Sequence, residues 1–136
     1  MILIDYQALI DAALEARNFS YSPYSTFKVG AALLCSNGKI FTGCNIESAA
    51  YSETICAERV AIFKAISQGA SGFSAIAIVG GISTPTSYTY PCGSCRQVLS
   101  EHCSEELKVV LYDGANIKIQ TLGQLFPCSF KKGSIK

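Results

Sequence analysis

The stretch PCGSCR at residues 91–96, together with CAER at residues 56–59, decides how this chain folds. In both stretches a helical pattern of apolar residues begins just after the first cysteine, over residues 57–68 and 93–103. The cysteines therefore lie at the predicted starts of two helices. Helix starts carry a partial positive charge and unpaired N–H groups, which stabilise thiolates and lower the pKa of cysteine. We expect both helices to point at one shared site.

Cys56, Cys92 and Cys95 are together suited to bind one zinc ion. Zinc binds thiolates at about 2.3 Å in a tetrahedron, and a site with three protein ligands leaves the fourth position to water, which is typical of catalytic zinc. A closed structural site would need a fourth side chain. His102 and Cys103 are the alternatives for it, but both lie two turns into the predicted helix. We therefore expect one catalytic Zn²⁺ in each subunit.

Glu58 follows the first ligand by two residues and is the candidate catalytic group. A carboxylate there can move protons between a zinc-bound hydroxide and a substrate without binding the metal. Deamination of a cytosine ring needs such a group, because N3 and the leaving amine each gain a proton. Zinc base deaminases pair a non-ligand glutamate with a His/Cys/Cys or three-cysteine site. The alternative is that Glu58 only favours the positive end of its helix.

Arg59 is expected beside the thiolates. Three thiolates and Zn²⁺ sum to a charge of −1, which opposes ionisation of a bound water. A guanidinium that donates hydrogen bonds to sulfur would withdraw part of this charge, as outer groups around metal ligands commonly do.

The rest of the pattern predicts an α/β fold. Helical spacing covers residues 4–17, and a short helical turn covers residues 122–126. Short apolar segments between turn residues predict five strands, at 27–36, 39–46, 74–79, 108–112 and 117–120. Strands that alternate with helices indicate a mixed sheet covered on both faces, a three-layer α-β-α sandwich. With 136 residues, we expect a single domain over residues 1–136.

The dipeptide Asn37-Gly38 predicts a hairpin between the first two strands. In the expected register Cys35 faces Ile40, and Cys44 faces Ala31. The two cysteines would then not lie opposite each other.

The composition excludes several classes of partner. Eleven Lys and Arg against ten Asp and Glu give a net charge of +1, without the basic stripe that a nucleic-acid polymer requires. The apolar runs are too short to span a bilayer, and the N-terminus lacks a signal-peptide pattern. Seven cysteines, an odd number, argue against a full disulfide framework. We expect a cytoplasmic protein without nucleic-acid or membrane partners.

The two cysteine stretches resemble those of the small homotetrameric zinc-dependent cytidine deaminases. The likeness continues through SPYS at 22–25, FxVGAA at 27–32, GCNIE at 43–47 and AAYS at 49–52. It implies the cytidine deaminase-like fold and hydrolytic deamination of cytidine and 2′-deoxycytidine to uridine and 2′-deoxyuridine, with release of ammonia, as in pyrimidine salvage. Cysteine as the first ligand separates the chain from polynucleotide-editing and deoxycytidylate deaminases, and the Glu-Arg pair separates it from blasticidin deaminases.

The resemblance also assigns individual roles. It implies that Cys56, Cys92 and Cys95 are the zinc ligands and that Glu58 is the proton shuttle. The implied nucleoside-binding residues include Phe27 against the pyrimidine and an amide–carboxylate pair on the ribose hydroxyls; the full set is Phe27, Asn45, Glu47, Ala57 and Phe130. By resemblance Phe130 reaches into a neighbouring subunit's site, so the implied assembly is a homotetramer with shared active sites.

Three alternatives stay open at this point. A loop rich in Ser, Thr and Tyr at residues 83–90 departs from the family pattern, as do Phe126 and Cys128, and the loop can alter access to the site. The first alternative is therefore a deaminase of a modified or analogue nucleoside. The second alternative is a zinc-stabilised binding module without catalysis. The third is an editor of RNA or DNA, which the near-neutral charge and the cysteine ligands disfavour.

Overall fold

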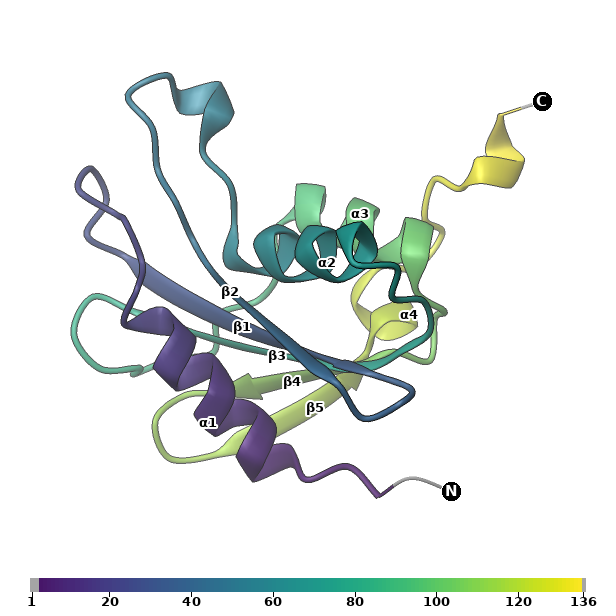
Figure 1. Cartoon of the computed structure of the whole chain (residues 1–136), viewed down its shortest axis with the longest axis horizontal. Coiled ribbons are helices and arrows are strands. Elements are labelled where there is room, and N and C mark those ends of the chain that lie inside the picture. The colour runs from purple at the N-terminus through teal and green to yellow at the C-terminus, as the bar shows by residue number, and fades with distance from the viewer. Residues whose placement is uncertain (1–2, 136) are drawn as a thin grey trace.

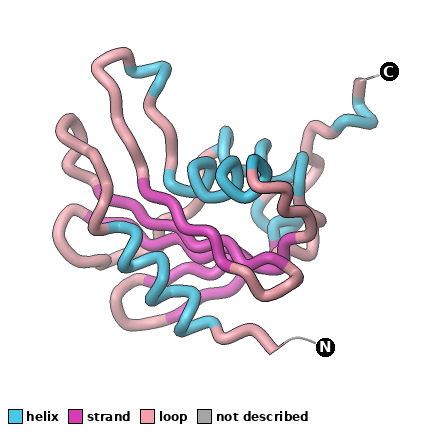
Figure 2. Tube along the Cα trace, viewed as in Figure 1, coloured by secondary structure: helices cyan, strands magenta, loops and turns pink. Residues whose placement is uncertain are grey.

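A five-stranded sheet in the order β2-β1-β3-β4-β5 forms the middle of the fold (Figures 1 and 2). The computed structural model describes residues 3–135. Only β3 and β4 pair in parallel, and the other neighbours are antiparallel. The strands are β1 (Lys28–Cys35), β2 (Ile40–Cys44), β3 (Phe73–Gly81), β4 (Lys108–Tyr112) and β5 (Ile117–Thr121). The predicted mixed sheet is confirmed.

Helices cover both faces of this sheet. The helix α1 (Tyr6–Arg17) lies on one face, and α2 (Ala57–Ser67) and α3 (Gly93–His102) lie on the other (Figure 1). Two apolar cores result, one on each side of the sheet. The short α4 (Leu122–Leu125) follows β5, and none of the helices between residues 3 and 135 combines the length and apolarity that crossing a bilayer requires.

Each core is built from side chains that alternate along the strands. On the α1 side, Leu9, Ile10 and Ala13 pack against Ala32, Ala75, Ala77, Val79 and Val110. On the α2 and α3 side, the core includes Ile62, Leu99, Leu33, Ile76, Ile78, Val109 and Leu111. Because both faces are covered, β1 and β3 are buried along most of their length, which explains why their sequences are continuously apolar.

The predicted register of the β1–β2 hairpin is wrong by one residue. The expected pairs were Cys35 with Ile40 and Ala31 with Cys44. Instead, Ile40 pairs with Leu34, and Cys44 pairs with Gly30. The expectation that Cys35 and Cys44 do not face each other still holds.

The turn explains the shift in register. The loop has three residues, 36–38, because the Gly38 N–H donates to the Cys35 carbonyl at 2.9 Å and the Cys35 N–H donates to the Lys39 carbonyl at 2.8 Å. Gly38 has a φ of 91°, so it takes the left-handed position that closes a three-residue hairpin. Asn-Gly indicated the turn correctly but not its length.

Gly43 in β2 fixes where α2 begins. A Cβ atom at Gly43 would lie 2.5 Å from the Ala57 carbonyl oxygen and 2.6 Å from the Ala61 nitrogen. Only a residue without a side chain allows the strand and the first turn of the helix to approach so closely. Because Cys56 immediately precedes α2, this contact also positions that thiol.

Candidate metal centre and active site

Three thiols meet where α2 and α3 begin. Cys56 is the N-cap of α2, Cys92 is the N-cap of α3, and Cys95 lies in the first turn of α3. The Sγ atoms of Cys56 and Cys92 are 3.8 Å apart, and those of Cys92 and Cys95 are 3.6 Å apart. Tetrahedral zinc with sulfur at about 2.3 Å requires sulfur atoms about 3.8 Å from one another. The donor set and its spacing therefore fit zinc, as the sequence predicted.

The protein supplies three ligands to this centre. Within residues 3–135, Cys56, Cys92 and Cys95 form a group whose ligand atoms all lie within 4.8 Å of one another, and no other His, Cys, Asp or Glu joins it. His102 ends α3, and Cys103 follows it. The closed structural site considered from the sequence would need one of these two side chains, so the geometry does not support it.

The thiols share protons in a way that prepares them for metal. The hydrogen bond from Cys95, together with those from Arg59 and Cys92, lowers the pKa of Cys56 to about 5. The same interaction with the Cys56 thiolate, together with burial, raises the pKa of Cys95. Cys56 is thus an anion while Cys95 keeps its proton, which a metal must displace on binding.

Arg59 lies beside the thiols, where the sequence placed it. Its Nη2 donates a hydrogen bond to the Cys56 Sγ at 3.5 Å. This contact supports the expected withdrawal of charge from the ligand, and its effect on catalysis stays a prediction.

Glu58 is the buried acid of the site. It occupies the first turn of α2, is only 4% exposed, and lines a cavity of about 310 Å³ together with Cys56 and Cys92. Burial raises the pKa of its carboxyl to about 7. A carboxyl with a pKa near neutrality can both accept and donate a proton, which is what proton transfer to and from a substrate requires.

The same cavity contains most of the predicted nucleoside-binding residues. Phe27, Asn45, Glu47 and Ala57 all line it. Ala57 is fully buried, whereas the Phe27 ring is 38% exposed and open to the cavity. The structure therefore brings these four residues to the three thiols and Glu58, although they are spread over thirty positions of the sequence.

Most hydrogen-bonding groups of the Asn45 amide bind other residues of the cavity wall. Its Oδ1 accepts hydrogen bonds from the Val29 N–H at 2.9 Å and from the Ser20 hydroxyl at 2.5 Å. Its Nδ2 donates to the Phe27 carbonyl at 2.8 Å. One Nδ2 hydrogen is left over, and Asn45 also fixes the backbone of Phe27. Sequence reasoning missed Ser20 because the contact spans 25 positions.

Glu47 is held as an anion by the loop that precedes β1. The N–H groups of Tyr24 and Ser25 donate to its Oε1 at 2.9 and 3.1 Å, and the Ser25 hydroxyl donates to its Oε2. The hydroxyl contact lowers the pKa of Glu47 below its ordinary range. The loop lies within the SPYS motif, which was noted in the sequence without a role for Ser25.

Thr26 in this loop has strained backbone geometry. Its φ of 58° is in the left-handed region, which is costly for a β-branched residue. The Thr26 N–H donates to the Ser22 carbonyl at 2.9 Å, which closes the turn. The strain lies between Ser25 and Phe27, two residues that line the cavity.

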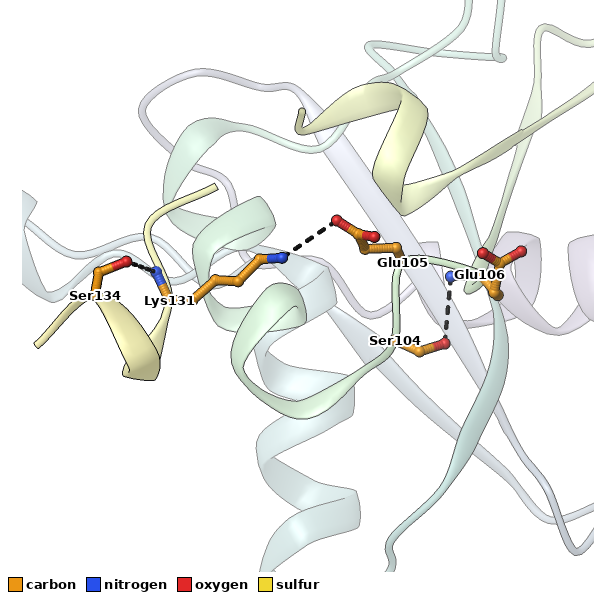
Figure 3. A network of polar contacts seen from close by, with 5 residues as sticks. All are labelled: Ser104, Glu105, Glu106, Lys131 and Ser134. Carbon is orange, nitrogen blue, oxygen red and sulfur yellow. Dashed lines mark hydrogen bonds and ion pairs between the residues drawn. The ribbon is translucent and has the colours of Figure 1, made fainter. Parts of the chain in front are cut away.

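Phe130 does not belong to the cavity of its own chain. It is 58% exposed and is not among the cavity residues. Its carbonyl accepts a hydrogen bond from Gln97 Nε2 at 2.9 Å, and Lys131 next to it pairs with Glu105 at 3.3 Å (Figure 3). The Lys131 N–H also donates to the Ser134 hydroxyl at 3.2 Å. The segment is thus tied to α3 and to the residues after it, and the predicted role toward a neighbouring subunit stays a prediction.

Comparison with known proteins bears on this site directly. Residues 4–111 match the family model described as the cytidine and deoxycytidylate deaminase zinc-binding region. The chain is 46% identical to a cytidine deaminase of Sporosarcina psychrophila over 130 residues, which are 95% of this chain and 93% of the relative. A crystal structure of cytidine deaminase from Burkholderia pseudomallei superposes with a TM-score of 0.86 at 45% identity and covers 93% of this chain and 100% of that one.

Two further relatives differ in how similar they are to this chain. A blasticidin-S deaminase of Bacillus cereus is 27% identical over 129 residues, 91% of each chain. The cytidine deaminase of Halalkalibacterium halodurans is 45% identical over 128 residues, 93% of this chain and 95% of the relative. The family model, these relatives and the geometry of the thiols agree: the chain belongs to the family of zinc-dependent cytidine deaminases.

Proposed function

We propose that the chain hydrolyses free cytidine and 2′-deoxycytidine to uridine and 2′-deoxyuridine with release of ammonia, and that Glu58 transfers the protons. It is a zinc-dependent hydrolase. The observation that carries the proposal is the position of Glu58. It is buried in one cavity with Cys56, Cys92 and the residues suited to hold a nucleoside, and Cys95 adjoins these two thiols. The substrate class is supported by the residues that line this cavity and by the named relatives.

The reaction adds water across the N3–C4 double bond of the cytosine ring and expels the amine from C4. Cys56, Cys92 and Cys95 would hold the zinc ion, which would supply Lewis acidity toward the attacking water. Glu58 accepts the proton that the water loses and gives a proton to N3. It then takes the proton of the hydroxyl added at C4 and gives it to the amine, so that the C4–N bond breaks, a C4 carbonyl forms and neutral ammonia leaves. Its pKa of about 7 suits both directions of transfer.

The nucleoside is oriented by residues on the opposite side of the cavity. Phe27 packs against the pyrimidine ring, and Ala57 contacts the base where α2 begins. The Glu47 carboxylate, which its loop keeps ionised, accepts hydrogen bonds from the ribose hydroxyls, and Asn45 donates its remaining Nδ2 hydrogen. A Glu47→Gln variant whose Michaelis constant for cytidine equalled that of the parent would refute the role of Glu47.

We also propose a cytoplasmic homotetramer in which Phe130 of one chain enters the site of another. The exposure of Phe130 outside its own cavity and the fixed path of its segment support this assignment.

Sedimentation of the protein is expected to give the mass of four chains. Phe130→Ala is expected to raise the Michaelis constant for cytidine. A protein that sediments as one chain with full activity would contradict the shared site.

Replacing the buried acid tests the reaction chemistry. Glu58→Gln keeps the shape of the side chain but removes its ability to accept and donate protons, so kcat for cytidine is expected to fall by about 10³-fold or more. The matched control is Glu53→Gln, an exposed acid outside the cavity, which should keep full activity. The measurement is the ultraviolet assay of cytidine loss. Equal activity of both variants would rule out Glu58 as the proton carrier.

Replacing one thiol tests the metal centre separately. Cys92→Ser is expected to lose most of the bound zinc, because a hydroxyl is a far weaker zinc ligand than a thiolate. Cys128→Ser, which changes an exposed cysteine outside the thiol group, should retain one zinc per chain. Metal content is measured by plasma emission after dialysis. Full zinc content in Cys92→Ser would show that the metal is bound elsewhere.

A further inference from the structure

Tyr90 forms a wall of the cavity that the reaction described above does not use. It lines the cavity together with Thr89 and lies two residues before Cys92. Its hydroxyl accepts a hydrogen bond from the Lys118 Nζ of β5 at 2.7 Å, and the same ammonium lies 5.4 Å from the centre of the Tyr90 ring. Tyr88 packs edge-on against Tyr90, with ring centres 6.5 Å apart at 70°. These contacts fix the ring in one place.

The loop that carries Tyr90 is fixed as well. The buried Arg17 of α1 donates from Nη2 to the Gly81 carbonyl at 2.5 Å and to the Ser83 carbonyl at 2.6 Å, where the loop leaves β3. Further along, the Pro85 carbonyl packs so closely on Gly114 that a Cβ atom there would lie 2.3 Å from its oxygen. The first part of the loop is thus tied to α1 and to the turn after β4, and its end is held by the contacts of Tyr90 with Lys118.

The topology indicates which edge of the base meets this wall. Glu58 belongs to α2, which packs mainly on β2 and β1, whereas Tyr90 is tied to β5 at the other end of the sheet. The base must present C4 to the thiols and N3 to Glu58. Because N3 and C5 are the two ring neighbours of C4, the C5 edge then faces away from Glu58. Thr89 and Tyr90 also line the cavity, and they come from the loop that Lys118 ties to β5.

We propose that Tyr90, held in place by Lys118, is a specificity-determining residue that limits the size of the substituent at C5 of the pyrimidine. This inference rests on the proposed function, because it takes the orientation of the base from Glu58. A fixed ring cannot move aside for a methyl group, and one methyl group in a close-fitting site changes kcat/KM by roughly 10- to 200-fold. The protein therefore selects cytidine over 5-methylcytidine by the position of one aromatic ring.

The test compares kcat/KM for cytidine and for 5-methylcytidine in the full-length zinc-loaded protein. The parent is expected to prefer cytidine by at least about tenfold. Tyr90→Ala should reduce that preference at least about fivefold, mainly through a gain on 5-methylcytidine. Tyr90→Phe keeps the ring and the cation above it, so its preference should stay close to that of the parent. Lys118→Met removes the contacts that hold the Tyr90 ring, so its preference for cytidine should lie between those of Tyr90→Ala and Tyr90→Phe.

The matched control is Ile117→Ala, because Ile117 neighbours Lys118 on β5 and its side chain points to the other face of the sheet. Its preference should equal that of the parent. If Tyr90→Ala and Lys118→Met both deaminate cytidine with an unchanged preference over 5-methylcytidine, the role of Tyr90 is overturned and the proposed function is not. If Tyr90→Ala does not fold, Lys118→Met decides by the same ratio. A parent protein that does not deaminate cytidine would instead overturn the proposed function.

Discussion

Two helix N-termini converge on one cluster of sulfur atoms, and the other parts of the site depend on that convergence. Thiols packed within 4.8 Å of one another are unfavourable as three anions, because their charges repel. The partial positive charges of α2 and α3, the Arg59 guanidinium and a divalent cation offset this repulsion. Without the metal, the site relieves the same repulsion by keeping a proton on Cys95.

The sheet makes this convergence possible by letting backbones approach closely. Gly43 brings β2 against the first turn of α2, and Gly80 near the end of β3 leaves room for the cavity wall. A Cβ atom at Gly80 would lie 2.6 Å from Thr89 Oγ1 and 3.0 Å from the Phe27 ring. Arg96 secures the other helix, because its Nε donates to the Pro91 carbonyl at 2.7 Å and its Nη1 to the Leu125 carbonyl. The metal centre and the cavity are thus positioned by the same core.

The features that could be predicted from the sequence are those set by local pattern. Helix starts at Ala57 and Gly93, the Cys92–Cys95 spacing and a carboxylate in the first turn follow from residue types at short range. Cys56 was added to the pair because zinc chemistry requires a third ligand. The hairpin register was missed because Asn-Gly fits a two-residue and a three-residue turn, and the structure uses the longer one. The contact of Ser20 with Asn45 and that of Tyr90 with Lys118 join positions 25 and 28 apart, which only the fold brings together.

The central claim is that three thiolates of one chain bind a metal that retains one position for chemistry. X-ray absorption at the zinc edge of the loaded protein tests it most directly. The account predicts three sulfur neighbours at about 2.3 Å and one lighter neighbour at about 2.0 Å. A shell of four sulfur atoms would mean a closed structural site, and a shell without sulfur would mean that zinc binds elsewhere. Either result would contradict the account.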